Sequence, residues 1–242
     1  MKKILKNVIV TLLLLSLSVS TAFLVYLHFF ASGEEKLSGE WTADLDMSEQ
    51  AAVTAFIWLQ DIEAVSVSLE DVESRMQGLT IRVNLTLEQI SRTEGTFQCS
   101  ISPESYDACR KAAYEAFAAA FQDLLIERLH MADYAGSTDR DSIEALVTET
   151  FGMSTVEYLM SCGPALLPSL EELQDEYDGS GTYEVSEGIL TRQFTSGPSD
   201  NVKTERYIRK DSDLILLEED NSDSEDSSSD YYPIRYVLKQ QE

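Results

Sequence analysis

TIRVNLTL, residues 80–87, alternates aliphatic side chains with polar or charged ones along its whole length. A period of two places the apolar side chains on one face of a strand and the polar ones on the other. The segment therefore predicts a half-exposed strand of an antiparallel sheet. Residues 96–101, TFQCSI, alternate in the same way after a turn around 92–95, so the two strands are expected to form a hairpin.

A long amphipathic helix is expected after the hairpin, because the apolar period there changes from two to about 3.6 residues. Ser102 supplies a capping hydroxyl and Pro103 stands at the first helical position, and both are signals of a helix start. The pattern continues to about Leu129. Its apolar face carries Tyr106, Ala113, Phe117, Phe121 and Leu124.

Three further helices are expected before strands resume. The capping patterns that begin the first two are Asp141 with Glu144 and Ser154 with Glu157. Pro164 and Pro168 then interrupt the helical pattern, and the last helix covers residues 169–177. The sequence thus predicts a helical insert over residues 102–177.

Short strands are expected on both sides of this insert. Residues 37–46 predict the first strand, and Asp46 with Glu49 then begins a helix over 51–60. No element is assigned to residues 63–77. After the insert, the expected elements are two short strands within 182–194, two within 203–219 and a closing strand over 231–239.

These strands predict the fold class. About seven short strands with one buried face need their edges paired or covered. We therefore expect an α+β fold, in which an antiparallel β-barrel or strongly curved sheet carries the helical insert at one end. Such a barrel either encloses a ligand cavity or is filled by its own side chains, and the sequence leaves both alternatives open.

An apolar stretch near the N-terminus predicts membrane attachment. Residues 8–30 contain 23 residues without a charge, and a helix of that length spans about 34 Å. Lysines precede the stretch and Glu34 and Glu35 follow it, so the positive-inside rule predicts a cytoplasmic N-terminus. We expect residues 1–33 to be a signal anchor that places residues 34–242 outside the cell membrane. The alternative is a signal peptide cleaved after Ala22 or Gly33.

The charge of the chain excludes one class of partner. Its formal net charge is −25, and because residues 1–33 contain three lysines and no acid, the remainder carries −28. Such a domain repels nucleic acid, which binds through lysine and arginine. The acidic loop at residues 218–230 lacks the glycine and the glutamate of a calcium loop, with Tyr231 where the glutamate belongs. We therefore expect neither nucleic acid nor a metal ion as a partner.

Both ends of the predicted domain carry a resemblance. Gly39-Glu40-Trp41 resembles the Gly-x-Trp of the first strand of lipocalin-like domains, and residues 181–183, 213–216 and 232–234 resemble their final strands. The chain is similar to uncharacterised membrane-anchored lipocalin-like proteins of Gram-positive gut bacteria, in which helices interrupt the sheet. The resemblance implies an arginine or lysine packed on Trp41, for which Arg235 and Lys239 are the candidates.

Few residues suggest chemistry. The three cysteines Cys99, Cys109 and Cys162 share no metal-ligand spacing, and they are interpreted as apolar core residues, with a Cys109–Cys162 bridge left open. His130 stands alone near the end of a helix, which favours a role at the helix terminus over catalysis. No phosphate loop or nucleophile motif accompanies it.

The functional expectation follows from these observations. No catalytic residue, cofactor or metal site is predicted, and no ligand-binding residue is assigned. The aromatic residues are expected to be core rather than the lining of a cavity, and the candidates are Trp41, Phe56, Trp58, Phe117 and Phe121. We expect a non-catalytic binding or interaction module at the cell envelope, whose partner is a small hydrophobic ligand or an envelope protein. The alternatives are a purely structural envelope protein and a hydrolase.

Overall fold

The computed structural model describes the chain in four stretches, residues 37–61, 67–197, 202–218 and 232–239. The predicted hairpin is confirmed: β2 (Thr80–Gln89) and β3 (Glu94–Ile101) pair in antiparallel fashion. The aliphatic side chains of β2 at alternate positions are buried and their neighbours are not. The two-residue period of the sequence therefore determines which face of the hairpin enters the core.

Eight antiparallel strands close into a barrel in which each strand pairs with the next along the chain. The first and last strands complete the ring, with Trp41 opposite Leu238. The predicted α+β class with an antiparallel barrel is thus confirmed, with one strand more than the approximate expectation. Closure leaves no open sheet edge among these strands. The other strands are β1 (Gly39–Asp46), β4 (Gly179–Ser186), β5 (Ile189–Ser196), β6 (Val202–Lys210), β7 (Asp213–Glu218) and β8 (Ile234–Leu238).

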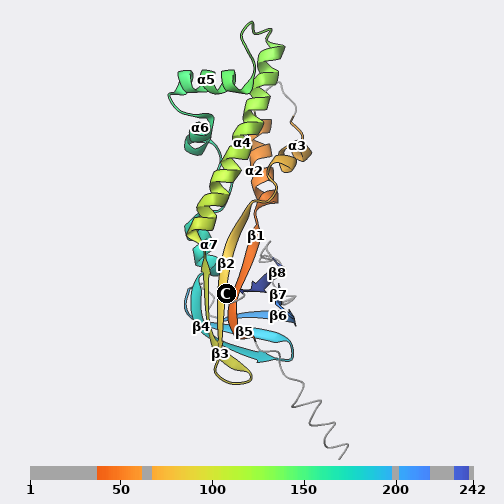
Figure 1. The fold of residues 1–242 in the computed structure, drawn as a ribbon, viewed down its shortest axis with the longest axis vertical. Coiled ribbons are helices and arrows are strands. Elements are labelled where there is room, and N and C mark those ends of the chain that lie inside the picture. Colours follow the sequence, from red (N-terminus) through yellow and green to blue (C-terminus); the bar gives the residue numbers. More distant parts are fainter. Residues whose placement is uncertain (1–36, 62–66, 198–201, 219–231, 240–242) are drawn as a thin grey trace, which may run out of the picture. The chain divides into compact units, whose positions relative to one another are not determined.

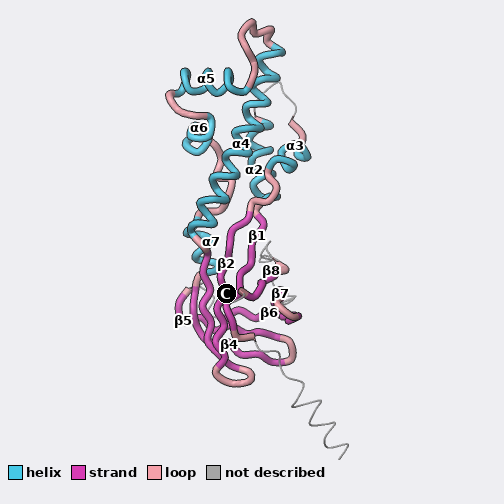
Figure 2. Tube along the Cα trace, in the orientation of Figure 1, coloured by secondary structure: helices cyan, strands magenta, loops and turns pink. Residues whose placement is uncertain are grey.

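Two insertions supply the helices, and both leave the barrel at the same end. Helices α2 (Ser48–Gln60) and α3 (Leu69–Arg75) connect β1 to β2. The other four connect β3 to β4 and are α4 (Pro103–Met131), α5 (Arg140–Phe151), α6 (Thr155–Cys162) and α7 (Leu170–Tyr177). Figures 1 and 2 show the helices gathered beyond the strand ends at which β1 and β3 finish.

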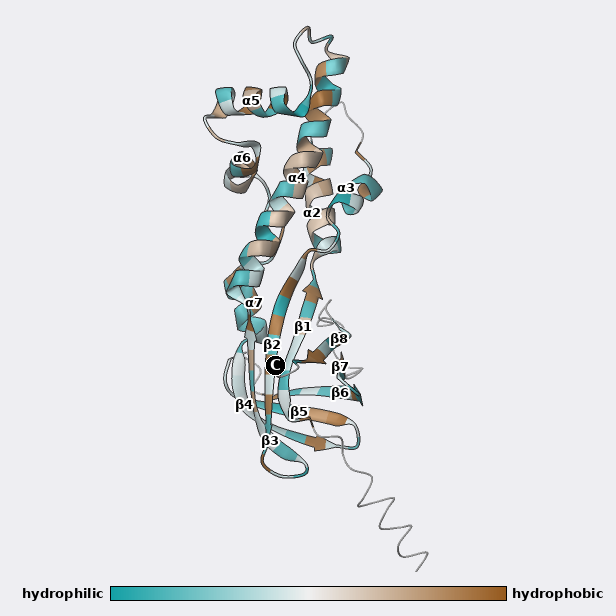
Figure 3. Cartoon of the chain, viewed as in Figure 1, coloured by the Kyte–Doolittle hydropathy of each residue, from teal (hydrophilic) through white to brown (hydrophobic). Residues whose placement is uncertain are grey.

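Helix α4 is the axis of this helical layer. Its N-terminus is capped as predicted, because the Ser102 hydroxyl accepts a hydrogen bond from the amide of Ser105. Polar and apolar residues alternate along it in Figure 3, and the predicted apolar face is buried. Trp58 of α2 packs edge-on against Phe117, with ring centroids 5.4 Å apart. A second hydrophobic core, separate from the barrel lumen, therefore holds α2 on α4.

The capping predictions are confirmed at α6 and wrong at α5. Ser154 and Glu157 form a reciprocal capping box as predicted. At α5 the cap is Asp139, whose side chain accepts a hydrogen bond from the amide of Ser142, while Asp141 lies in the first turn. Asp139 has the extended backbone of a cap residue, and its carboxylate is nearer to the free amides.

The start of α2 also differs from the capping-box prediction. Met47 occupies the cap position, and its side chain forms no capping hydrogen bond. Asp46 contributes from one residue earlier, where its carboxylate accepts a hydrogen bond from the amide of Ser48. The helix therefore begins directly at the end of β1.

Two predicted segments lie outside the described residues. They are the signal anchor within residues 1–33 and all of the acidic loop after Glu218, which is the last residue of β7. Across the described stretches, no helix combines the length and the apolar character needed to cross a bilayer.

Candidate functional site

The barrel lumen is packed with its own side chains where the structure describes it. Trp41 and Tyr236 are each only 1% exposed, and the aliphatic side chains of β2 that face inward are equally buried. A cavity wide enough for a ligand leaves its lining side chains accessible to a water-sized sphere. The described lumen residues therefore form a core.

An ion pair is buried inside this core. The Nε and Nη2 atoms of Arg192 donate to the two carboxylate oxygens of Glu205 at 2.9 and 2.8 Å. The Tyr232 hydroxyl donates to the same carboxylate at 2.5 Å. The guanidinium also lies over the rings of Phe97 and Phe194, 5.5 and 5.7 Å from their centroids. Both charges thus have hydrogen-bond partners, as buried charges require.

Burial fixes the protonation states around this ion pair. Burial acts to lower the pKa of Arg192, but the interaction with the Glu205 carboxylate, together with those with Cys99, Tyr236 and Tyr232, outweighs burial and raises it. Burial raises the pKa of Tyr232, and the adjacent Glu205 charge raises it further. Burial likewise raises the pKa of the Cys99 thiol. At neutral pH the tyrosine therefore remains a donor and the thiol remains protonated, which suits a structural role.

A cation packs on Trp41, but it is neither of the predicted residues. The guanidinium of Arg209, on β6, lies 4.7 Å from the Trp41 ring centroid. Arg235 instead pairs with Asp213 at 2.6 Å, and Lys239 approaches Glu40 at 3.9 Å. The prediction was wrong because inward positions on β8 are the even-numbered ones, so residues 235 and 239 face away from the lumen.

An open cleft lies in the helical layer, where α4 faces the segment that connects α6 to α7. Its volume is about 360 Å³, within the range of about 300–1,000 Å³ that ligand sites occupy. We call it the α4 cleft. Its lining residues are Tyr106, Arg110, Tyr114, Ala165, Leu166, Leu167, Ser169 and Glu172.

Two tyrosines of α4 hold the opposite wall of the α4 cleft in place. The Tyr114 hydroxyl donates to the carbonyl oxygen of Pro164 at 2.9 Å, and the Tyr106 hydroxyl donates to that of Pro168 at 3.1 Å. Positions four apart lie on one face of a helix, so Arg110 stands between these two anchors. The connecting segment is therefore attached at both ends, with the cleft between the attachments.

The charged groups of the α4 cleft are only partly used. Among the residues that the structure describes, Arg110 forms no ion pair or hydrogen bond, and its side chain is partly buried. Glu172 accepts hydrogen bonds from the amide and the hydroxyl of Ser169, both at its Oε2 atom. These bonds lower the pKa of Glu172, which stays ionised. The cleft thus offers a guanidinium and a carboxylate oxygen, Oε1, that can still accept.

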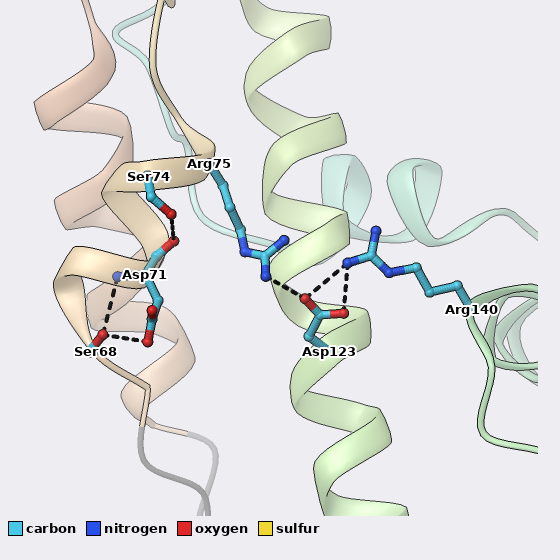
Figure 4. Close-up of polar contacts among 6 residues, drawn as sticks. All are labelled: Ser68, Asp71, Ser74, Arg75, Asp123 and Arg140. Atoms are coloured by element: carbon cyan, nitrogen blue, oxygen red, sulfur yellow. Dashed lines mark hydrogen bonds and ion pairs between the residues drawn. The ribbon is translucent and has the colours of Figure 1, made fainter.

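A second set of charged residues joins three helices and is fully paired (Figure 4). Asp123 of α4 binds Arg75 of α3 at 2.6 Å and Arg140 at the start of α5 at 2.8 Å. The neighbouring pocket is smaller, about 140 Å³. Because Asp123 is already bound on both sides, these contacts hold α3 and α5 against α4 and leave little for a ligand.

The remaining residues singled out in the sequence do not meet in one place. His130 lies in the last turn of α4, and its Nε2 atom is 2.7 Å from the Thr138 hydroxyl. Cys99 and Cys109 are buried free thiols, and Cys162 is an exposed one, so there is no Cys109–Cys162 bridge. Of the aromatic residues expected in the core, Trp41 is buried in the barrel and Phe117 and Phe121 are buried on α4, whereas Phe56 and Trp58 of α2 are only half-buried.

No family model, curated protein or solved structure matches this chain at a significant level. The site therefore has to be judged on its geometry. Sequence reasoning missed the α4 cleft, although the spacing of Tyr106, Arg110 and Tyr114 was a signal for one of its walls. The other wall lies about 60 residues further along the chain and becomes visible only in the fold.

Proposed function

We propose that this chain is a non-catalytic binding module at the cell envelope and that its ligand occupies the α4 cleft. The observation that carries the proposal is the contrast between the described lumen residues, which are packed, and an open cleft in which the Arg110 guanidinium and the Oε1 atom of Glu172 remain available. Sites of this kind combine an apolar floor with a few polar groups that orient the ligand. Here the exposed Ala165 supplies apolar surface next to the buried Leu166 and Leu167, and Arg110 and Glu172 supply the polar groups.

The placement at the envelope rests on the sequence. The uncharged stretch over residues 8–30 is long enough to cross a bilayer, and the lysines before it favour an outward-facing C-terminal domain. Lipocalin-like kinship is also part of the proposal, since eight-stranded up-and-down barrels include the lipocalins. In this chain the binding role would have moved from the lumen to the helical layer.

A purely structural role in the envelope is the second candidate. The buried pair of Arg192 and Glu205 favours it, because a lumen crossed by hydrogen-bonded charges resembles a rigid core more than a binding cavity. Binding is preferred because the structural role assigns nothing to the α4 cleft.

Saturation-transfer NMR on the full chain in lipid nanodiscs tests the binding role. A mixture of water-soluble metabolites is offered to the wild type, to Ala165→Trp and to Ala112→Trp. Ala165 is an exposed residue of the cleft wall, so an indole there should cover the opening, whereas Ala112 is exposed on α4 outside the cleft lining. We expect a ligand signal that Ala165→Trp abolishes and Ala112→Trp retains. Equal signals in all three proteins, or none in the wild type, would reject the proposal.

A further inference from the structure

The α4 cleft presents two opposite charges from two opposed elements. Arg110 comes from the N-terminal third of α4, and Glu172 comes from the first turn of α7. They form no ion pair with each other, although both line the same cleft. Each can therefore pair with a ligand group of the opposite sign: Arg110 with a carboxylate and Glu172, through Oε1, with an ammonium.

The surroundings of these two charges restrict the ligand further. The cleft lining also includes the exposed Ala165, which is followed in the chain by the buried Leu166 and Leu167, and this apolar segment suits a hydrocarbon or aromatic side chain. The chain carries a formal charge of −25, so a free anion meets long-range repulsion, whereas a molecule with one charge of each sign does not. A ligand with balanced charges is therefore favoured over a simple carboxylate.

We infer that the α4 cleft binds a zwitterion of the amino acid type, with its carboxylate on Arg110, its ammonium on Glu172 and an apolar side chain against residues 165–167. Both groups of an amino acid or a short peptide are charged at neutral pH. This inference rests on the proposed binding function and adds the ligand class. Free amino acids and dipeptides share the chemistry and differ in the separation of their charges.

Calorimetry on the full chain in nanodiscs tests the inference with a matched set of probes. L-Phenylalanine carries both charges, 3-phenylpropionate lacks the ammonium, phenethylamine lacks the carboxylate, and Phe-Gly holds the charges further apart. We expect one of the two zwitterions to bind and each singly charged probe to bind at least about tenfold more weakly, since a lost charge-assisted hydrogen bond changes affinity by about that factor or more. Preference for L-phenylalanine would indicate free amino acids as the ligand, and preference for Phe-Gly would indicate dipeptides.

Two variants and two controls assign the charges. Arg110→Gln and Glu172→Gln should each weaken binding of the zwitterion at least about tenfold. Glutamine at position 172 can still complete the capping box of α7, so the helix start is preserved. The controls Lys111→Gln and Glu171→Gln make the same charge changes at neighbouring positions outside the cleft lining, and their affinity should equal that of the wild type.

The outcomes separate this inference from the binding function. Selective binding of a zwitterion that both cleft variants weaken supports the inference. A ligand that Ala165→Trp blocks, but that neither Arg110→Gln nor Glu172→Gln affects, overturns the zwitterion assignment and leaves the binding function standing. If Ala165→Trp blocks no ligand, both are overturned.

Discussion

Breaking the buried ion pair of the barrel should cost far more stability than breaking an exposed one. Arg192 is 5% exposed and Glu205 is 1% exposed, so Arg192→Leu leaves a carboxylate in the core with only the Tyr232 hydroxyl as a donor. Removing one partner of a buried pair costs about 3–5 kcal/mol. For a domain of this size each kcal/mol lowers the melting temperature by about 2–4 °C, which gives a decrease of about 6–20 °C.

Two comparisons isolate the electrostatic origin of this loss. The double variant Arg192→Leu/Glu205→Leu removes both charges and should recover to within about 2 kcal/mol of the wild type, because an apolar pair of similar volume can replace a buried ion pair. The control Arg235→Leu breaks the pair with Asp213, whose side chains are 65% and 25% exposed, and should cost at most about 1 kcal/mol.

Thermal unfolding of the full-length variants, followed by near-ultraviolet circular dichroism, measures these differences. The single variant should melt well below both the double variant and the exposed-pair control. If the double variant were as unstable as Arg192→Leu, the loss would come from packing rather than from an unpaired charge, and the electrostatic reasoning would be refuted.

Three further predictions concern the helical layer and the thiols. Hydrogen bonds from hydroxyl and amide groups lower the pKa of Asp139 to about 2, below its unfolded value of about 3.9. The contribution of Asp139 to folding stability is therefore present above about pH 4 and is lost toward pH 2. The difference in melting temperature between the wild type and Asp139→Asn should shrink over that range. Glu144→Ala should cost about 1–3 kcal/mol and speed amide exchange at the start of α6, because the fully buried Thr155 loses its acceptor. A maleimide should label Cys162 in the native protein, while the buried thiols Cys99 and Cys109 should react only after unfolding.

The strands of the barrel could be predicted from sequence because the alternating pattern that indicates each strand lies within a few consecutive residues. Alternation in TIRVNLTL and in the later strands identifies the buried face without knowledge of any partner. The long helix could be predicted equally well, because Ser102 and Pro103 mark its start and apolar residues recur on one face along α4. The need to pair strand edges predicted either a barrel or a strongly curved sheet, and the structure has the closed barrel.

Features that depend on distant partners could not be predicted. The cation on Trp41 is Arg209, and choosing it over Arg235 requires the register of β6 and β8. The cap of α5 was misplaced because Asp139 and Asp141 both suit a helix start, and only the backbone conformation distinguishes them. The α4 cleft forms only where α4 packs against the segment before α7, and no local sequence pattern predicts that contact.

Methyl NMR of the full chain in nanodiscs separates the α4 cleft from the barrel lumen most directly. Assigned methyl resonances of Leu166 and Leu167 report on the cleft, and those of Leu85 and Leu216 report on the lumen. During titration with a ligand found by saturation transfer, we expect the cleft resonances to shift and the lumen resonances to stay in place. Shifts confined to Leu85 and Leu216 would place the ligand inside the barrel and contradict the assignment of the site to the helical layer.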